Sequence, residues 1–434
     1  MSKFKYTTVT AVVVANMVGT GVFTSLGFQL LDIRSGFVLL LLWAVGGVIA
    51  LSGAMTYAEL GSAMPRSGGE YNFLTRIYHP AVGFASGWVS ATVGFAGPTA
   101  LAAMTFAAYA TSSLGSEPNP WMLRAIACGL IIALTLVHAS TRRNSGGMQV
   151  VFTVLKVGVI VVFCIGALWI NDTPQPVRFL FATEDLPLIT SGAFAVSLIY
   201  VSYAYTGWNA ATYLSGELDD PQRTLPRILI VGTSVVMVLY VVLNYVFLKV
   251  TPMDAMVGEL EVGYIAADAA FGELGGRFAG LVLSLLLIST VSAMTVAGPR
   301  VLQVIGEDIK QLQVLARTNS DGVPATAILV QSSLAILFIL TSSFESVLVF
   351  SGFILALNSL VTVLGVFVLR IRQPDLPRPY KTFGYPITPL IYLSLTAWTL
   401  AFVVINKTQE SMLGLGVIVL GLIVYALFPK QKAD

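Results

Sequence analysis

The run N-M-V-G-T-G-V-F, from Asn16 to Phe23, lies about halfway along the first apolar stretch of the chain, which extends from residue 7 to about residue 31. Gly19 and Gly21, with Thr20 between them, weaken a helix at a depth where lipid offers the backbone no water. A glycine pair also occurs as a small-residue face that lets two membrane helices pack closely. The run therefore predicts either an interrupted helix or a close helix contact.

A second glycine site favours the interrupted helix. The apolar stretch from 187 to 215 carries Y-A-Y-T-G-W-N, from Tyr203 to Asn209, at a similar depth, with Gly207 flanked by aromatic residues and an amide. The two glycine sites lie five apolar stretches apart, so an inverted repeat of five helices would place them in corresponding positions. Paired interruptions of this kind are the best sequence pointer to the central site of a transporter.

The composition of the chain requires lipid around most of it. Of 434 residues, 56% are hydrophobic and 11% are charged, and the mean hydropathy is +0.83, which is more apolar surface than a soluble domain can bury. A membrane helix needs roughly 20 apolar residues, and we expect an all-α membrane protein of twelve spans in one domain. The expected spans lie near 7–31, 37–63, 81–112, 121–140, 147–170, 187–215, 226–250, 275–304, 323–341, 344–370, 386–406 and 410–428.

The positions of Lys and Arg predict the orientation. Basic loops stay on the cytoplasmic side of a membrane, and with both termini inside, most of the 24 Lys and Arg residues fall on that side. We therefore expect a multi-pass protein of the cell membrane with cytoplasmic termini. Glu59 and Glu217 lie near cytoplasmic helix ends, where a structural or gate-forming salt bridge is expected rather than proton transport.

Other classes of function lack the residues that they need. Cys128 and Cys164 lie in apolar runs and predict no disulfide framework, and His79 and His138 lack the spacing of metal ligands. A net charge of +2 with scattered basic residues does not predict a nucleic acid partner. Since no Ser/His pair, paired Asp or metal constellation is present either, we expect no enzyme, no catalytic residue, no cofactor and no metal.

An interrupted helix pair has the chemistry to recognise a zwitterion. Free N–H groups of the half-helix after a break favour a carboxylate, and free carbonyls of the half-helix before it favour an ammonium. We expect the amides around Thr20 and Gly21, with the Thr20 hydroxyl, to bind the substrate carboxylate. The carbonyls expected near the substrate amino group belong to Met17, Val18, Tyr203 and Ala204. No acidic residue lies near mid-membrane in the first, third, sixth, eighth or tenth span, which favours a substrate with a neutral side chain.

Lys156 is the one basic residue that lies deep inside an expected span rather than near one of its ends. It lies about nine residues into the helix, or roughly 14 Å at 1.5 Å per residue, close to the bilayer centre. A lysine can reach the interface by snorkelling, but this depth favours a buried cation that replaces a metal ion or carries a proton. Its expected partners are carbonyls of the first helix and hydroxyls of the eighth, such as Ser289, Thr290 or Ser292.

Six short motifs together resemble the amino acid-polyamine-organocation (APC) superfamily, in particular its L-type amino acid transporter (LAT) branch. They are N-M-V-G-T-G-V-F (16–23), P-R-S-G-G-E-Y (65–71), A-Y-T-G-W-N-A-A-T-Y (204–213), G-E-L-D-D-P-Q-R-T-L-P-R (216–227), G-P-R (298–300) and R-P-Y-K-T-F-G-Y-P (378–386). The resemblance covers the first eleven expected spans. It implies sodium-independent amino acid transport on a LeuT-type fold with unwound helices 1 and 6. In that fold 7–170 and 187–370 form a five-plus-five inverted repeat and 386–428 forms two further helices, all within a single transmembrane transporter domain, 1–434.

The same resemblance implies roles for individual residues. The turn at 19–21 matches the carboxylate-binding turn, and the unwound segment of helix 6 is matched by Tyr203, Ala204, Tyr205, Thr206 and Gly207. Tyr203 departs from the family, which usually has a gating phenylalanine there. Asn209 matches a position implicated in substrate contact. Lys156 matches the helix 5 lysine found where sodium-coupled relatives bind an ion.

The resemblance also bears on partners. Animal members of the LAT branch form a disulfide bond with a glycoprotein through a cysteine in the loop between helices 3 and 4, and the corresponding loop here, 112–120, has none. We expect a carrier of neutral L-amino acids that needs no disulfide-linked heavy chain and works by exchange or with a proton. An amine or polyamine carrier, a channel and a membrane-embedded amino acid sensor stay open as alternatives.

Overall fold

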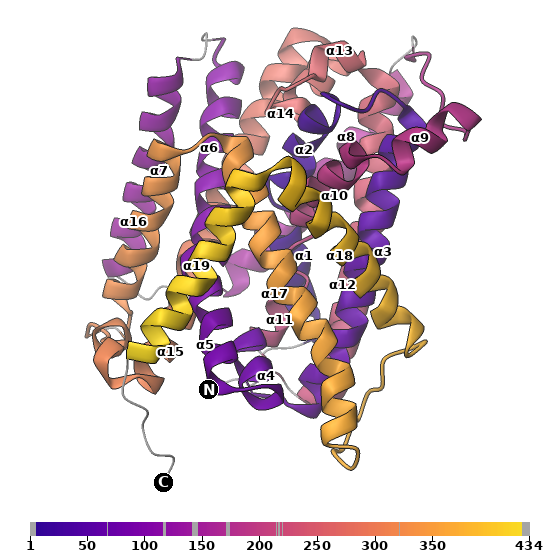
Figure 1. Ribbon diagram of the computed structural model, residues 1–434. Helices are drawn as coiled ribbons and strands as arrows, with labels where there is room; N and C mark the ends of the chain where they lie inside the picture. Colours follow the sequence, from indigo (N-terminus) through magenta and orange to yellow (C-terminus); the bar gives the residue numbers. More distant parts are fainter. Residues whose placement is uncertain are drawn as a thin grey trace.

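The computed structural model describes residues 6–66, 68–115, 119–140, 146–170, 174–213, 215, 218, 220–320 and 322–427, and its regular secondary structure is helical throughout these residues (Figure 1). The first helices are α1 (Tyr6–Met17), α2 (Gly21–Gln29), α3 (Gly36–Ala63), α4 (Gly69–Ile77), α5 (Pro80–Val89), the π-helix η1 (Ser90–Gly94), α6 (Ala96–Ser113), α7 (Pro120–Ser140) and α8 (Gly146–Ile170). They are followed by η2 (Thr183–Asp185), α9 (Leu186–Ile189), α10 (Gly192–Ala204), α11 (Ala210–Tyr213), α12 (Pro221–Val250), α13 (Met253–Met256), α14 (Val262–Ala297), α15 (Pro299–Asp308), η4 (Lys310–Ala316), α16 (Ala325–Thr341), α17 (Phe344–Arg372), α18 (Ile387–Asn406) and α19 (Thr408–Leu427).

Ten helices of the described residues are long and apolar enough to cross a membrane, or eleven if a bent pair, Thr183–Ile189 with Gly192–Ala204, is counted as one span. The protein is therefore a multi-pass membrane protein, but twelve spans remain a prediction. The expected span 323–341 is α16, which has 17 residues and is shorter than the usual membrane helix. The segment 251–274, expected to be a loop, contains α13 and the start of α14, which is kinked at Gly272.

Serine caps begin three of the helices. The side chains of Ser35, Ser191 and Ser343 each accept a hydrogen bond from the amide three residues further on, at 3.1 to 3.3 Å. Such a cap satisfies one of the amides that a helix start leaves without an intrahelical partner. One of these helices, α10, is the first half of the sixth expected span, which is interrupted after Ala204.

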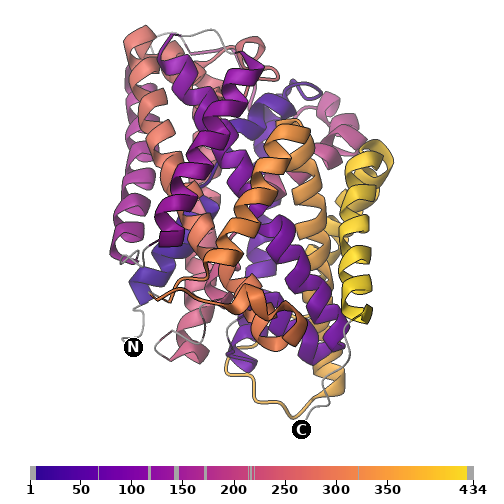
Figure 2. The same cartoon turned by 90° about the vertical axis from the view of Figure 1, so that its left-hand side faces the viewer.

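The helices pack into two neighbouring groups (Figures 1 and 2). In one group α6 packs against α14, α7 and α16. In the other, α12 packs against α3 and α1, and α10 packs against α2, α3, α17 and α18. The interrupted helices belong to the second group.

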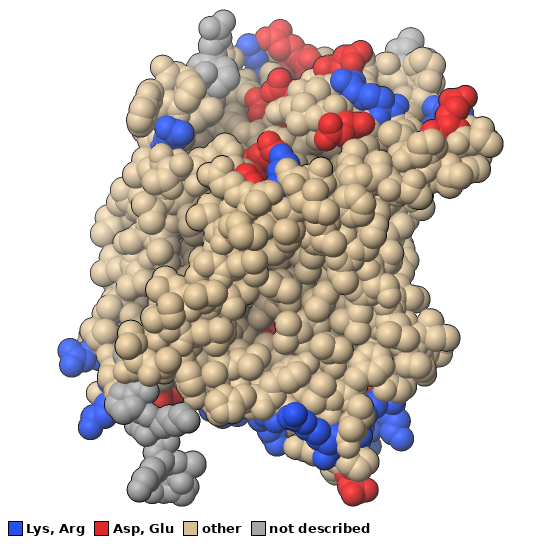
Figure 3. Space-filling view, viewed as in Figure 1, with Lys and Arg blue, Asp and Glu red and all other residues tan. Residues whose placement is uncertain are grey.

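Charge separates the two ends of the molecule. At the lower end in Figure 3 Lys and Arg outnumber the acidic residues, whereas the upper end mixes both signs. The lower end surrounds α4 and the ends of α3 and α17, and we call it the basic end; its basic residues include Arg66, Arg76, Arg370, Arg372 and Arg378. Several residues used in the sequence argument, among them Lys3, Lys5, Ser67, Gly216 and Glu217, lie outside the described residues.

The salt bridge expected at Glu59 is present at the basic end. The carboxylate of Glu59, which is 0% exposed, accepts two hydrogen bonds from the Arg370 guanidinium, at 2.8 and 2.6 Å. The backbone amide and hydroxyl of Thr382 each donate to it at 2.7 Å. This bidentate ion pair joins the last turn of α3 to the last turn of α17.

Candidate functional site

The first helix is interrupted where its glycines predict. α1 ends at Met17 and α2 begins at Gly21, and the three residues between them are not helical. Within the interruption the Gly19 amide donates to the Met17 carbonyl at 2.7 Å. The Thr20 side chain makes no capping hydrogen bond to α2. The first amides of α2 therefore form a helix N-terminus of the kind that binds anions.

The sixth expected span is interrupted over five residues. α10 ends at Ala204, and the short helix α11 begins at Ala210. The carbonyl of Tyr203 accepts from both the amide and the hydroxyl of Thr206, at 2.9 and 2.6 Å. Gly207 has a φ of +99°, a backbone conformation that L side chains rarely adopt, so glycine is required at the turn.

The two interruptions touch each other. A Cβ atom added to Gly21 would lie 2.6 Å from the Cα atom of Ala204, and one added to Gly207 would lie 2.8 Å from the carbonyl carbon of Asn16. Only glycine leaves room for such backbone approaches. The structure thus brings together the two glycine sites that the sequence places five spans apart, and Met17, Val18, Thr20 and Tyr205 are buried there.

Tyr240 of α12 joins the two interruptions and was not found from the sequence. Its hydroxyl lies 2.5 Å from the Met17 carbonyl oxygen and 3.2 Å from the Ala204 carbonyl oxygen. Both carbonyls were expected to face the substrate amino group, so Tyr240 occupies one acceptor position on each. The available signal was a tyrosine inside an apolar span, since a buried hydroxyl needs a partner.

Lys156 lies on α8 beside the first interruption. Its ammonium donates to the Thr290 hydroxyl at 2.7 Å and lies 3.5 Å from the Val18 carbonyl oxygen. The side chain is 5% exposed, so the ammonium is buried and does not reach the surface by snorkelling. A fixed positive charge therefore stands next to the backbone of the interruption.

Asn209 has a partner within the protein that the sequence did not predict. Its side-chain amide donates to Glu70 of α4, a buried carboxylate that the sequence argument did not single out as a site residue. Thr206 likewise uses its hydroxyl on the Tyr203 carbonyl. The hydroxyl of Tyr203, in contrast, lies next to the side chain of Thr20 across the two interruptions.

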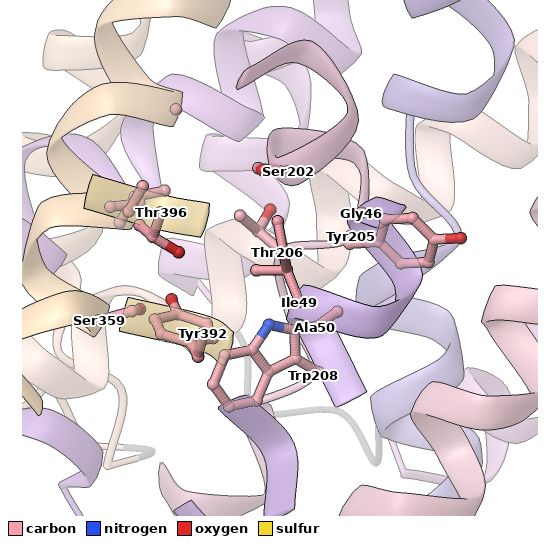
Figure 4. A pocket seen from close by; sticks show the side chains of 13 residues that line it. Gly46, Ile49, Ala50, Ser202, Tyr205, Thr206, Trp208, Ser359, Tyr392 and Thr396 are labelled. Atoms are coloured by element: carbon pink, nitrogen blue, oxygen red, sulfur yellow. The ribbon is translucent and has the colours of Figure 1, made fainter. Parts of the chain in front are cut away.

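A partly open pocket lies beside the second interruption. Figure 4 shows Thr206 and Trp208 of the interruption on one side of it and Tyr392 and Thr396 of α18 on another, with α3 and α17 completing the wall. The described residues that line it carry no charge. None of residues 16–21 is among them, so the pocket is separate from the N-terminus of α2.

Comparison with known proteins gives the family. A model of the amino acid permease family matches residues 4–428, almost the whole chain. The protein therefore belongs to this family, within the APC superfamily.

Its relatives include transporters of the LAT type. The chain is 30% identical to the mouse (Mus musculus) large neutral amino acids transporter small subunit 2 over 432 residues, 96% of this chain and 79% of the relative. It is 28% identical to the mouse b(0,+)-type amino acid transporter 1, with 97% and 86% of the two chains covered. It is 26% identical to the serine/threonine exchanger SteT of Bacillus subtilis (strain 168), with 97% and 95% covered. The protein is thus a membrane transporter of amino acids and not an enzyme.

Proposed function

We propose that this protein carries neutral L-amino acids across the cell membrane by alternating access, without sodium, and by exchange or together with a proton. The observation that supports this most strongly is the contact between the two interruptions, where the N-terminus of α2 meets the C-terminus of α10. The first supplies partial positive charge for a carboxylate and the second supplies carbonyls for an ammonium. The substrate would lie across this contact, with Gly19, Thr20 and Gly21 at its carboxylate.

Some of the carbonyls expected to bind the substrate amino group already accept hydrogen bonds within the protein. Tyr240 and Thr206 already donate to the carbonyls of Met17, Ala204 and Tyr203. A carbonyl oxygen has two lone pairs. The Met17 carbonyl already accepts from the Gly19 amide and the Tyr240 hydroxyl, and the Tyr203 carbonyl accepts from the amide and the hydroxyl of Thr206. Of the three, only the Ala204 carbonyl keeps an acceptor position, which the amino group would use beside the Tyr240 hydroxyl.

Lys156 supports independence from sodium. Its ammonium stands 3.5 Å from the Val18 carbonyl oxygen and supplies a positive charge that a sodium-coupled carrier would take from solution. The charge belongs to the chain, so it does not leave with the substrate. Either exchange or proton-linked uptake is compatible with such a fixed cation.

The proposed architecture is a single transmembrane domain, 1–434, with twelve helices and both termini in the cytoplasm. It has a LeuT-type inverted repeat, 7–170 and 187–370, and two added helices in 386–428. α1 begins and α19 ends at the same end of the molecule (Figure 2). This supports an even number of spans. The excess of Lys and Arg at the basic end supports a cytoplasmic location for that end (Figure 3).

Uptake into proteoliposomes tests the function. The purified chain, reconstituted alone, is given a panel of labelled amino acids with and without internal amino acid, sodium and a pH gradient. We expect saturable uptake of neutral amino acids that does not change when sodium is replaced. Uptake of putrescine but not alanine would replace the proposal with an amine carrier, and binding without uptake of any amino acid would replace it with a sensor.

The same preparation tests whether a partner is needed. Cys128 and Cys164 lie in α7 and α8, and the loop 112–120 contains no cysteine. We propose that the chain transports amino acids without a disulfide-linked heavy chain. Activity that appears only after a second subunit is added would contradict this.

A further inference from the structure

Glu70 is a buried carboxylate at the basic end of the molecule. It lies in the first turn of α4, and its side chain is 1% exposed. Its two oxygens accept hydrogen bonds from three side chains: Tyr57 of α3 at 3.1 Å, Asn209 of the second interruption, and Tyr213 of α11. Among the described residues, no Lys, Arg or His lies within ion-pair distance of Glu70.

The three donors join parts of the molecule that are far apart in sequence. Asn209 is the last residue of the second interruption and Tyr213 is the last residue of α11, so the carboxylate holds α11 at both of its ends. Tyr213 also approaches Ser90, the first residue of η1, with 3.4 Å between the two hydroxyl oxygens. Glu70 and its donors therefore bridge the group of helices around α3 and the chain that leads into α6.

This arrangement also reaches α1, the helix that leads into the first interruption. α11 packs against α1 and α4, and a Cβ atom on Gly69 would lie 2.8 Å from the ring of Tyr213. At the same turn Gly207 meets the backbone of Asn16. The segment 207–213 consequently joins the second interruption and the end of α1 to α4 at the basic end.

The helix that carries Glu70 is itself anchored. The Tyr71 hydroxyl donates to Asp308 at the end of α15, at 2.5 Å. Burial and the Asp308 carboxylate raise the pKa of Tyr71 above its ordinary value, so this hydroxyl remains a donor at neutral pH. An anchored α4 means that opening at Glu70 would move α11 rather than α4.

The donor chemistry suits a contact that opens. A buried carboxylate is costly, and neutral donors compensate it less completely than a cation does. When the segment 207–213 moves away, water can reach the carboxylate and replace the lost hydrogen bonds. A buried ion pair would instead leave two unpaired charges when it is broken.

We propose that Glu70 is a positioning residue for transport, which latches Asn209 and Tyr213 so that the substrate site is closed toward the basic end. Release of this latch opens the site at that end, the cytoplasmic side in the proposed orientation. The inference rests on the proposed function for its consequence, which is transport, but the opening itself can be measured without a substrate.

The test combines two latch variants with a matched control. Glu70→Gln removes the charge with little change of shape, and Tyr213→Phe removes one donor and keeps the ring. Tyr78→Phe removes a hydroxyl from the end of the same α4, where it donates to the Val361 carbonyl and not to Glu70. A reporter cysteine, Ala210→Cys, is placed on α11 in a Cys128→Ala background, and buried Cys164 of α8 remains as an internal control.

The readout is the rate at which a water-soluble maleimide labels the reporter in detergent. Both latch variants are expected to label roughly tenfold faster than the parent, the scale set by loss of one charge-assisted hydrogen bond. Tyr78→Phe should label like the parent, and Cys164 should stay protected in all of them. Equal labelling rates in parent and both latch variants would overturn the latch, and so would faster labelling of Cys164 in parallel, since that indicates general loosening.

Transport then separates the latch from the substrate assignment. In proteoliposomes of defined orientation, Glu70→Gln should lower the KM measured at the basic end and raise the KM at the opposite end, because the population shifts toward one open state. A structural defect would reduce the maximal rate without opposite changes in KM. If the parent transports no amino acid while the labelling response is present, the latch is supported and the proposed function fails.

Discussion

The two interruptions are built differently although they meet at one place. The first is three residues long and is followed by α2, a helix of nine residues whose N-terminus faces the contact. The second is five residues long and is followed by α11, which has four residues. A nine-residue helix has two turns of aligned peptide dipoles, whereas four residues barely make one turn. The first interruption is thus the better anion site.

The side chains that hold the two interruptions in place also differ. The Tyr240 hydroxyl contacts both interruptions, but only the first is held by a buried cation, Lys156. The second is held on α11 by neutral donors to Glu70. The first interruption is thus fixed to the neighbouring helices, as the proposed carboxylate site requires, while the second is fastened by a contact that water can replace.

The contact between the interruptions should be the most sensitive point. Gly21→Ala places a Cβ atom 2.6 Å from the Cα atom of Ala204 and forces the two backbones apart. Overpacking of this kind costs about 1–3 kcal/mol, and we expect uptake into proteoliposomes to fall roughly 100-fold. Gly158→Ala is the matched control, because a Cβ there meets nothing within 4 Å. Normal uptake by Gly21→Ala would mean that the two interruptions do not need to touch.

Removal of the cation should have the next largest effect. Lys156→Ala deletes the ammonium beside Val18, and a hydrogen bond to a charged group is worth about 1.5–3 kcal/mol. We expect the transport rate to fall at least roughly tenfold, measured as initial uptake of labelled substrate. Thr290→Val removes only the partner hydroxyl and should cost less. Uptake by Lys156→Ala at the parent rate would exclude a role for this residue.

Loss of the hydroxyl that joins the interruptions should be milder. Tyr240→Phe removes a neutral donor to Met17 and Ala204, worth about 1 kcal/mol, and should change the substrate KM several-fold in uptake and lower the melting temperature. Tyr245→Phe on the same helix is the control, since its ring packs against Phe179 away from the interruptions. An unchanged KM together with an unchanged melting temperature would show that the two carbonyls need no donor.

The smallest effect is expected at the carboxylate end. Thr20→Val removes one hydroxyl, while the amides of α2 remain in place, so ligand binding measured by thermal shift should weaken by only a few-fold. Thr24→Val one turn further along α2 removes a hydroxyl that donates to the Thr20 carbonyl and should leave binding unchanged. Complete loss of binding in Thr20→Val would mean that the side chain, rather than the backbone, holds the carboxylate.

Much of the fold could be predicted from local sequence. Apolar runs of membrane length predict the long helices, because a backbone in lipid must satisfy its hydrogen bonds within its own helix. Glycine at 19, 21 and 207 predicts where two of them are interrupted. Lys156 is conspicuous because an ammonium in an apolar run is costly. All of these signals act within one helix.

What the sequence by itself determined is therefore the class of the protein and the position of its two interruptions. The partners of the interruptions were decided only by tertiary structure: Tyr240 is 223 residues from Met17, and Tyr213 is 143 residues from Glu70. By its chemistry, the Asn209 amide could bond either to a substrate or to a carboxylate side chain of the protein. Only the packing of α11 on α4 directs it to Glu70. The type of a side chain and its local sequence indicate which groups it can form hydrogen bonds with. Which partner it finds depends on how helices distant in sequence pack together.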